Sequence, residues 1–290
     1  MRERNQERNM AIATSDFEYI CGLIRTKSGI VLEAGKEYLV EARLTALIRR
    51  QKIDTLATLV AQLRSNSNDP LHRLAVEAMT TNETSFFRDH HPFEALKSTV
   101  IPALMAKQAA TKSLNIWCGA SSTGQEPYTI AMTLCEAIPK LSEWKLTFIA
   151  TDLSAEMVAR SQAGKYNQIE VNRGLPAPLM VKYFERHGLE WQIKEPLRKM
   201  VDFREMNLTT PWPLLPQMDL IFMRNVLIYF DTATKKTILA QIRQVLKPDG
   251  YLFLGCAETT LCLDDGYERT QIEKSGCYRI RQQRTLAKAA

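Results

Sequence analysis

The hydrophobic and polar positions of residues 1–80 repeat with the period of amphipathic helices. Apolar side chains recur at i, i+3, i+4 and i+7, with polar residues between them. Ser15 and Glu18 have the spacing of a capping box ahead of the first stripe. We therefore expect a small all-helical N-terminal domain over residues 1–80. Its four apolar stripes are Phe17, Ile20, Cys21 and Ile24; Val40, Leu44, Leu47 and Ile48; Leu56, Leu59, Val60 and Leu63; and Leu71, Leu74, Ala75 and Ala78.

Residues 99–290 follow a different pattern, in which short apolar runs alternate with helical stretches. This alternation is typical of an open α/β sheet, and the last two runs stand close enough to form a hairpin. We expect a seven-stranded, Rossmann-like sheet, because no second βαβαβ half follows the first. The expected strands are Asn115–Gly119, Lys145–Ala150, Met200–Phe203, Met218–Met223, Tyr251–Cys256, Tyr267–Ile272 and Cys277–Arg281, with helices at Glu126–Ile138 and Thr232–Leu246.

Two segments stand outside this alternation. Residues 165–199 contain Gly174, Pro176, Pro178 and Pro196 and the short apolar run LEWQI, which predicts an insertion built on a small antiparallel sheet. Residues 81–98 join the two domains, and there Asn82, Thr84 and Arg88 surround a pair of phenylalanines. This segment either closes over a ligand or is an ordinary linker with the aromatic pair as a hydrophobic plug.

Composition excludes several classes of protein. With 45% hydrophobic and 24% charged residues among 290, the chain is typical of a soluble globular protein. No apolar run reaches the roughly 18 residues of a membrane helix, and MRERNQERNM is too polar for a signal peptide. Six cysteines are scattered without a CxxC pair, and the adjacent His90 and His91 cannot share a helical face. We expect a cytoplasmic protein without membrane insertion, disulfide framework or metal.

The net charge of +6 includes an arginine flank, Arg43, Arg49 and Arg50, beside the second apolar stripe. Two interpretations remain open for it: a solvated helix face, or a docking surface for an acidic partner. Further basic residues lie toward the C-terminus, where a solvated end is the ordinary interpretation. We expect no nucleic-acid partner.

The stretch Leu114–Ile138 carries the main chemical signal. A strand, the small-residue run Ala120–Gly124 and a helix form a ligand-binding corner of such a sheet. A P-loop would need Lys and Ser or Thr next, but this chain has Gln125 and Glu126, whose carboxylate would repel phosphate. The pattern GxGxxG also fails, because Ser121 takes the second glycine position. The run therefore either suits a nucleoside without phosphates or is only a tight connection.

Asp152 supports the nucleoside interpretation. It follows the strand Lys145–Ala150 at its carboxyl end, where an acid can bind both ribose hydroxyls of an adenosine. The competing interpretation is a helix N-terminal cap, for which Ser154 is another candidate. S-adenosylmethionine fits this pattern, because it has adenosine and ribose but no phosphate. Its ammonium group could meet a carboxylate such as Glu126.

Six motifs, taken in order, carry a resemblance to a known family. They are TNETSFFR, SSTGQEPYT, ATDLSAEM, NLTTPWP, RNVLIYFD and LKPDGYLFLG. Together they resemble the CheR family of chemotaxis-receptor glutamate O-methyltransferases over almost the whole chain. The resemblance implies transfer of the methyl group of S-adenosylmethionine to glutamate side chains of cytoplasmic chemoreceptor domains, which forms methyl esters and S-adenosylhomocysteine. It also implies receptor recognition by residues 1–80, a cofactor-site role for residues 81–98 and a methyltransferase domain over residues 99–290.

The family's cofactor positions carry over to this sequence one by one. Two departures occur near them: Glu83 stands where the family often has leucine, and Gly119 where it often has alanine. Neither change removes a polar group that the site needs. The implied positions are Asn82, Thr84, Arg88, Glu126, Asp152, Asn207, Leu208, Arg224 and Asn225.

The implied reaction needs positioning rather than a general base. A glutamate carboxylate has a pKa of about 4.3 and is already anionic at neutral pH. The enzyme must align it with the sulfonium methyl and remove its water. We expect Arg88 and Tyr229 to orient this carboxylate in a monomeric enzyme.

Two alternatives to this function are a methyltransferase for nucleic acid or another protein, and a non-catalytic nucleoside-binding module. Base methyltransferases usually carry NPPY or DPPY where this chain reads RNVLIY.

Overall fold

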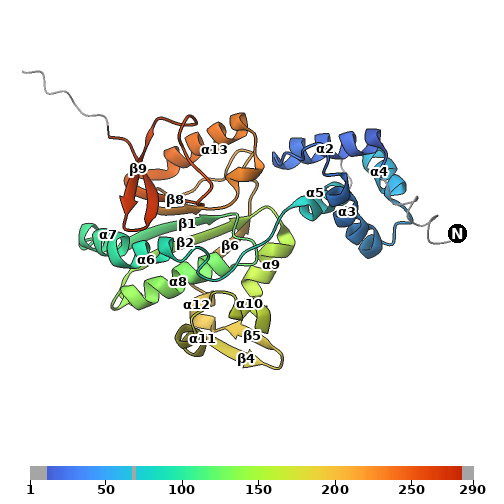
Figure 1. Cartoon of the computed structure of the whole chain (residues 1–290). Coiled ribbons are helices and arrows are strands. Elements are labelled where there is room, and N and C mark those ends of the chain that lie inside the picture. Colours follow the sequence, from blue (N-terminus) through green and yellow to red (C-terminus); the bar gives the residue numbers. More distant parts are fainter. Residues whose placement is uncertain (1–11, 67–69, 283–290) are drawn as a thin grey trace, which may run out of the picture. The chain divides into compact units, whose positions relative to one another are not determined.

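A computed structural model describes residues 12–66 and 70–282 of the chain (Figure 1). These residues fall into two compact units. Residues up to Thr81 together with Tyr229–Thr234 form the helical unit, and Asn82–Ile228 with the residues from Lys235 onward form the α/β unit. The polar N-terminus MRERNQERNM and the last residues of the basic C-terminus lie outside the described residues. The described residues include no helix with the length and hydropathy of a membrane span.

The helical unit confirms the four expected helices and most of their inward faces. The stripes of α2, α3 and α4 are buried at every expected position except Cys21 and Leu56, which are half-buried. The capping box is wrong, because α2 begins before Ser15 and its N-cap is Ala13, which has no side-chain cap. The helices are α2 (Thr14–Ser28), α3 (Glu37–Gln51), α4 (Leu56–Ser65) and α5 (Pro70–Met79).

The expected face of α5 is also partly wrong. Its buried residues are His72, Ala75, Val76, Glu77 and Met79, so the inner face is rotated by about one residue from the expected stripe. Of the expected stripe only Ala75 is buried, and the two leucines and the second alanine are half-buried. The rotation follows from packing, since α5 contacts both α2 and α3 and buries the side chains that face both helices.

The arginine flank of α3 is not uniform. The half-buried Arg43 donates hydrogen bonds to the Met79 carbonyl and, at 2.9 Å, to Thr81 Oγ1, so it ties α3 to the end of α5. Burial lowers the pKa of Arg43. Arg49 and Arg50 are exposed in the last turn of the same helix. Arg43 therefore has a structural role, whereas Arg49 and Arg50 are exposed at the surface of the helical unit.

The helical unit is completed by a distant part of the chain, Tyr229–Thr234. The Val31 amide donates to the Tyr229 carbonyl at 2.9 Å, and Ile30 forms an antiparallel bridge with Phe230. Arg25 forms an ion pair with Asp231 at 2.7 Å. These contacts join the loop after α2 to a segment about two hundred positions later in the sequence.

The α/β unit confirms the expected fold. Among the described residues, seven strands form one sheet in the order β6-β2-β1-β7-β8-β10-β9, and three short strands form a second sheet. The five strands from β6 to β8 are parallel, and β10 is antiparallel to both β8 and β9. The strands of the large sheet are β1 (Ser113–Gly119), β2 (Lys145–Asp152), β6 (Asp202–Glu205), β7 (Met218–Met223), β8 (Leu246–Leu254), β9 (Tyr267–Ile272) and β10 (Ser275–Ile280).

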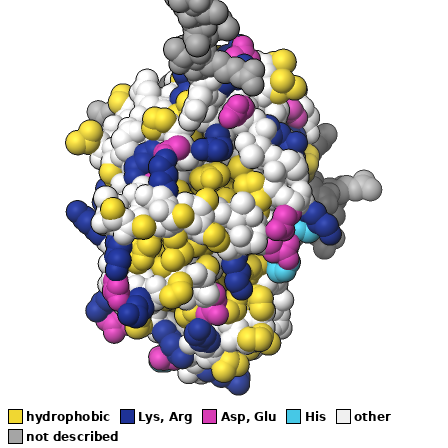
Figure 2. Space-filling model, turned by 90° about the vertical axis from the view of Figure 1, so that its left-hand side faces the viewer, with side chains coloured by type: hydrophobic (Ala, Val, Ile, Leu, Met, Phe, Trp, Pro, Cys, Tyr) yellow, Lys and Arg dark blue, Asp and Glu magenta, His cyan; other side chains and the backbone are white. Residues whose placement is uncertain are grey.

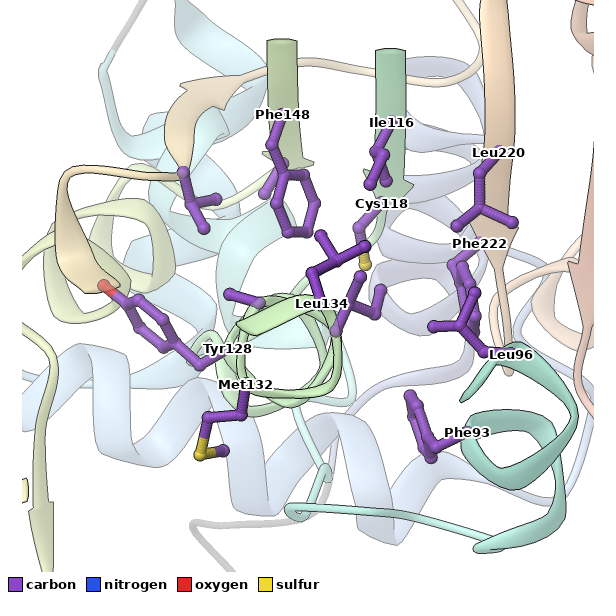
Figure 3. Packing of buried hydrophobic residues seen from close by; sticks show 14 of the residues in the cluster. Phe93, Leu96, Ile116, Cys118, Tyr128, Met132, Leu134, Phe148, Leu220 and Phe222 are labelled. Carbon is purple, nitrogen blue, oxygen red and sulfur yellow. The ribbon is translucent and has the colours of Figure 1, made fainter. Parts of the chain in front are cut away.

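Helices cover both faces of the large sheet, with α8 and α13 on opposite sides (Figure 1). Figure 3 shows apolar side chains of the central strands directed at α8 and at the segment around Phe93. This burial on both faces explains why β7, MDLIFM, is a continuous apolar run. The helices of this layer are α6 (His91–Ala95), α7 (Ile101–Lys107), α8 (Gln125–Ala137), α9 (Ala155–Ala163) and α13 (Thr232–Val245), with a π-helical turn at Leu96–Val100 and 3-10 turns at Leu141–Glu143 and Leu227–Tyr229.

The expected insertion is present as an antiparallel sheet with short helices. β5 pairs with β3 on one side and with β4 on the other. Two aromatic residues of the insertion, Tyr166 and Phe184, pack edge-on against Phe86 of the segment that joins the domains. The elements are β3 (Lys165–Asn167), α10 (Gln168–Asn172), α11 (Ala177–Tyr183), β4 (Phe184–His187), β5 (Glu190–Ile193) and α12 (Glu195–Arg198).

The surface combines charge with exposed apolar groups. Figure 2 shows a face on which hydrophobic side chains gather in the centre, with Lys and Arg side chains around them. Part of the positive charge of the chain is therefore displayed next to apolar surface. Of the cysteines, Cys118 and Cys277 are buried, whereas Cys256 and Cys262 are exposed.

Candidate functional site

The turn between β1 and α8 has an unusual backbone. Ala120, Ser122 and Gly124 have φ values of 54°, 50° and 89°, all in the left-handed region. A Cβ at Gly124 would lie 2.9 Å from Ser161 Oγ and 3.2 Å from its Cα, so glycine is required there. Non-glycine residues in this region are uncommon and cluster at functional sites. A plain tight connection would not need two of them within three residues.

Asp152 is the last residue of β2 and lies beside this turn. Its carboxylate accepts the backbone N–H of Ser122 at 2.7 Å and that of Ser154 at 2.9 Å. Only 7% of Asp152 is exposed. The cap of α9 is Ser154, whose hydroxyl accepts the Met157 N–H, so Asp152 is not the N-terminal cap of that helix. Its charge is held at the carboxyl edge of the sheet instead.

A buried polar atom in the same turn has no partner. Ser121 Oγ makes no hydrogen bond within the described part of the chain, although the Ser121 amide donates to the Thr151 carbonyl at 2.9 Å. A buried hydroxyl without a partner costs free energy, which a bound polar ligand would recover. The donors and acceptors here, one carboxylate and one free hydroxyl, suit a neutral sugar or nucleoside better than a phosphate.

The segment Asn82–Arg88 lies against this corner. Ser122 Oγ donates to the Asn82 carbonyl at 2.8 Å, and the Phe87 amide donates to Thr129 Oγ1 in α8 at 3.1 Å. Thr84, half-buried, lies between these two attachments. Arg88 donates to the Glu83 carbonyl at 3.0 Å. The structure therefore attaches this segment to the turn after β1 at Asn82 and to α8 at Phe87.

Glu83, the departure from the family pattern, has a partner of its own. It forms an ion pair with Arg173 of the insertion at 2.5 Å, and the hydrogen bond from Arg173, followed by its charge, lowers the pKa of Glu83. The second departure, Gly119, is explained by Met223 on the neighbouring strand. A Cβ at Gly119 would lie 2.4 Å from Met223 Cε, so an alanine there would require the methionine to move.

Arg224 follows β7 and is the most buried charge of the site, with 4% of it exposed. Its guanidinium pairs with Glu126 at the start of α8 and with Asp89 at 2.6 Å, and it donates to the Arg88 carbonyl at 3.1 Å. Burial lowers the pKa of Arg224, but the two carboxylates outweigh burial and the pKa is raised. This cluster joins the linker, α8 and β7 at one point.

Both oxygens of the Glu126 carboxylate already have partners, one strong and one weak. One oxygen is engaged by Arg224, and the other accepts a weak hydrogen bond from the Cys118 thiol at 3.5 Å. Burial, then the nearby Glu126, raises the pKa of Cys118 well above its usual range. The thiol stays protonated at neutral pH, so Glu126 keeps one weakly engaged oxygen.

Asn207 and Leu208 follow β6 and reach the same edge of the sheet, because the Met206 amide donates to the Asp152 carbonyl at 2.8 Å. Asn207 Oδ1 accepts the Thr209 amide and hydroxyl, and it closes a turn there. The Leu208 carbonyl accepts the indole N–H of Trp212 at 3.1 Å. These contacts fix the backbone after β6 near Asp152.

The two residues expected to orient the substrate fall in different units. Arg88 belongs to the α/β unit, and Tyr229 belongs to the helical unit, where its carbonyl accepts the Val31 amide. Asn225 follows Arg224 and has a φ of 59°. Its backbone N–H donates to the Glu258 carboxylate at 2.8 Å. Every expected cofactor residue lies in the α/β unit.

Comparison with known proteins adds a family to this geometry. The CheR methyltransferase SAM binding domain matches residues 82–275, and the CheR methyltransferase all-alpha domain matches residues 15–80. The chain belongs to the CheR methyltransferase family. The expectation of a methyltransferase that uses S-adenosylmethionine is thereby confirmed, and the corner after β1 lies inside the matched cofactor-binding domain.

Curated relatives match over nearly their whole length. Chemotaxis protein methyltransferase 1 of Pseudomonas aeruginosa is 40% identical over 276 residues, which cover 94% of this chain and 100% of the relative. Chemotaxis protein methyltransferase Cher2 of Pseudomonas putida is 38% identical with the same coverage. Chemotaxis protein methyltransferase 1 of Vibrio cholerae is 37% identical and covers 93% of this chain and 99% of the relative.

Sequence reasoning missed three residues of this edge: Ser121 as a hydrogen-bonding group, Asp89 and Glu258. In the sequence, Ser121 is noticeable only as the residue at the second glycine position of GxGxxG. Asp89 and Glu258 pair with residues 135 and 33 positions away, so no local spacing reveals them. A usable signal existed for Glu258, since a polar residue just beyond a buried strand such as β8 lies at the ligand-binding edge of this kind of sheet.

Proposed function

We propose that this enzyme transfers the methyl group of S-adenosylmethionine to glutamate side chains of cytoplasmic chemoreceptor domains and so forms glutamate methyl esters. The reaction would take place in the cytoplasm. The observation that carries the proposal is the corner after β1, where Asp152 binds the turn that contains the unpartnered Ser121 hydroxyl, within a domain of the CheR methyltransferase family. The curated relatives, which carry the name chemotaxis protein methyltransferase, support the receptor as the substrate.

In this proposal Asp152 accepts hydrogen bonds from the ribose hydroxyls. Its two backbone donors, Ser122 and Ser154, fix the carboxylate so that little reorganisation is needed when the ribose binds. Ser121 Oγ is a further partner for the cofactor. The weakly engaged oxygen of Glu126 is the acceptor for the ammonium group.

The chemistry of the cofactor is an electrophilic methyl group on a sulfonium. A glutamate carboxylate with a pKa of about 4.3 is anionic at neutral pH and attacks without a general base. The side chains proposed to orient it, Arg88 and Tyr229, supply a charge and a hydroxyl. A loose contact serves better than a tight one, because an arginine bound closely to the carboxylate lowers its nucleophilicity.

The remaining cofactor positions are Asn82, Thr84, Asn207, Leu208 and Asn225. The hydrogen bond from Ser122 to the Asn82 carbonyl and that from Met206 to Asp152 support this assignment, since they hold the linker and the β6 loop at the Asp152 edge. The linker interpretation as a simple hydrophobic plug accounts for Phe86 but not for these polar attachments.

Receptor recognition is proposed for the helical domain, residues 1–80. Receptor methylation helices present carboxylates, and the exposed Arg49 and Arg50 would attract them mainly by raising the encounter rate. Arg43 has a lesser role here, because its guanidinium is engaged at Met79 and Thr81. The enzyme is proposed to act as a monomer without nucleic acid or metal.

The test is methyl transfer from methyl-labelled S-adenosylmethionine to a purified cytoplasmic receptor fragment. Label should enter the receptor and be released as methanol by mild alkali, because carboxyl esters are base-labile whereas N-methyl groups are not. Label that resists alkali, or that enters added nucleic acid instead, would support a different substrate class. Binding of S-adenosylhomocysteine without any turnover would support the non-catalytic alternative.

A further inference from the structure

Glu258 lies just beyond β8 and is almost fully buried, with 8% exposed. Its carboxylate accepts four backbone N–H groups. Asn225 donates at 2.8 Å, Val226 at 2.8 Å, Leu227 at 2.7 Å and Gly255 at 2.6 Å. Hydrogen bonds to an ionised acceptor are shorter and stronger than neutral ones, so this is a strong local anchor.

The four donors lie just beyond the carboxyl ends of two neighbouring strands, β7 and β8. Three of them are consecutive residues directly after Arg224, at the carboxyl end of β7, and the fourth is Gly255 at the end of β8. The carboxylate therefore fixes the backbone that leaves β7 to the end of β8. Without it, four buried or half-buried N–H groups would lose their acceptor, at a cost for each one.

The junction around Glu258 has no spare room. A Cβ at Gly255 would lie 2.7 Å from Asn225 Nδ2, 2.8 Å from Glu258 Oε2 and 2.9 Å from the Asn225 amide nitrogen. Asn225 itself has a φ of 59°, in the left-handed region that asparagine adopts more readily than most other non-glycine residues. Glu258 contacts this residue through the Asn225 amide.

We infer that Glu258 is a positioning residue for the methyl-transfer site. It acts through the backbone of residues 225–227, and thereby sets where Arg224 and Asn225 meet the cofactor. This inference rests on the proposed function, because it takes these two residues as part of the cofactor site. Asp89 and Glu126 hold the side chain of Arg224, whereas Glu258 holds the backbone of the three residues that follow it.

The main test is Glu258→Gln, which keeps the size of the side chain but removes its charge and turns an NH₂ group toward backbone donors. The matched control is Asp219→Asn. Asp219 is a buried carboxylate near the opposite end of β7, where it accepts the Asn115 amide at 2.8 Å and Lys247 Nζ at 2.7 Å. Both variants should lower the melting temperature, but only one affects the carboxyl end of β7.

For Glu258→Gln we expect at least about a tenfold weaker S-adenosylhomocysteine affinity by calorimetry and a similar fall in kcat/KM. Asp219→Asn should leave both within about twofold. Gly255→Ala is the second variant, since it keeps the Glu258 charge but crowds both Asn225 and the Glu258 carboxylate, and it should weaken affinity in the same direction.

Equal affinities for Glu258→Gln, Gly255→Ala and the wild type would overturn the inference while leaving the proposed function intact. A wild-type protein that does not bind S-adenosylhomocysteine would overturn the proposed function itself. If Glu258→Gln does not fold, the affinity of Gly255→Ala decides the question. A loss of affinity in Asp219→Asn as large as in Glu258→Gln would reduce Glu258 to a general contribution to stability.

Discussion

Replacing Asp152 should affect cofactor binding and folding together, and the two effects can be separated by the choice of substitution. Asp152→Ala removes the acceptor of two buried N–H groups, from Ser122 and Ser154. Each unsatisfied group costs about 1–3 kcal/mol, so the pair costs roughly 2–6 kcal/mol of folding free energy. A typical domain has only about 5–15 kcal/mol, so this variant would be a poor test of binding.

Asp152→Asn is the better perturbation, because its amide oxygen still accepts one of the two N–H groups. We expect a stability loss of about 1–3 kcal/mol from the other group. The loss of a charged partner for the ribose should weaken S-adenosylhomocysteine affinity by about 1.5–3 kcal/mol, which is roughly ten- to a hundredfold. Calorimetry at a temperature well below the melting transition measures the affinity.

The control is Ser154→Ala, which removes the hydroxyl that caps α9 but keeps the backbone N–H that Asp152 accepts. It should cost about 1 kcal/mol of stability and leave the affinity unchanged. If Asp152→Asn is folded and binds S-adenosylhomocysteine as the wild type does, Asp152 lies outside the cofactor site. The reasoning from the edge of the sheet would then be refuted.

Three further results are expected. Tyr229→Phe should lower kcat with little change in cofactor affinity. An equal loss of cofactor affinity would contradict the assignment of Tyr229 to the substrate carboxylate and would indicate a role in cofactor binding. Arg49→Glu should slow receptor methylation at low salt and not at high salt, and an unchanged rate at low salt would show that the arginine flank is a solvated face. Arg43→Ala should instead mainly lower the melting temperature, because Arg43 is bound to Met79 and Thr81. The exposed Cys256 and Cys262 should react with a thiol reagent in the native protein, and the buried thiols only after unfolding; rapid reaction of all six cysteines would contradict the burial described above.

Much of the fold could be predicted because it depends on local periodicity. The stripe of α3 and the apolar run of β7 both specify an element and its buried side without reference to distant residues. The failures have the opposite cause. Whether α5 buries Leu71 or Val76 is decided by its contacts with α2 and α3. Ser15 cannot cap α2, because the helix begins at Thr14 and so already includes Ser15.

The site divides in the same way. Asp152 could be placed at the edge of the sheet, because it follows a recognisable strand. What the sequence could not reveal is that Glu126 is shared with Arg224, or that Arg43 is tied to the end of α5. Both facts depend on pairs separated by 98 and 36 positions, and an arginine has the same appearance in a sequence whether it is buried or exposed.

The segment Tyr229–Thr234 makes the two units difficult to separate by cutting the chain. The backbone passes between them after Thr81, after Ile228 and after Thr234, so three covalent links join them rather than one. An N-terminal fragment that stops at Thr81 would lack the partners of Ile30 and Arg25. A fragment that begins at Asn82 would carry this segment without the helices that hold it. The helical part is thus not a detachable module, and exchanging it between relatives would require transplanting the later segment as well.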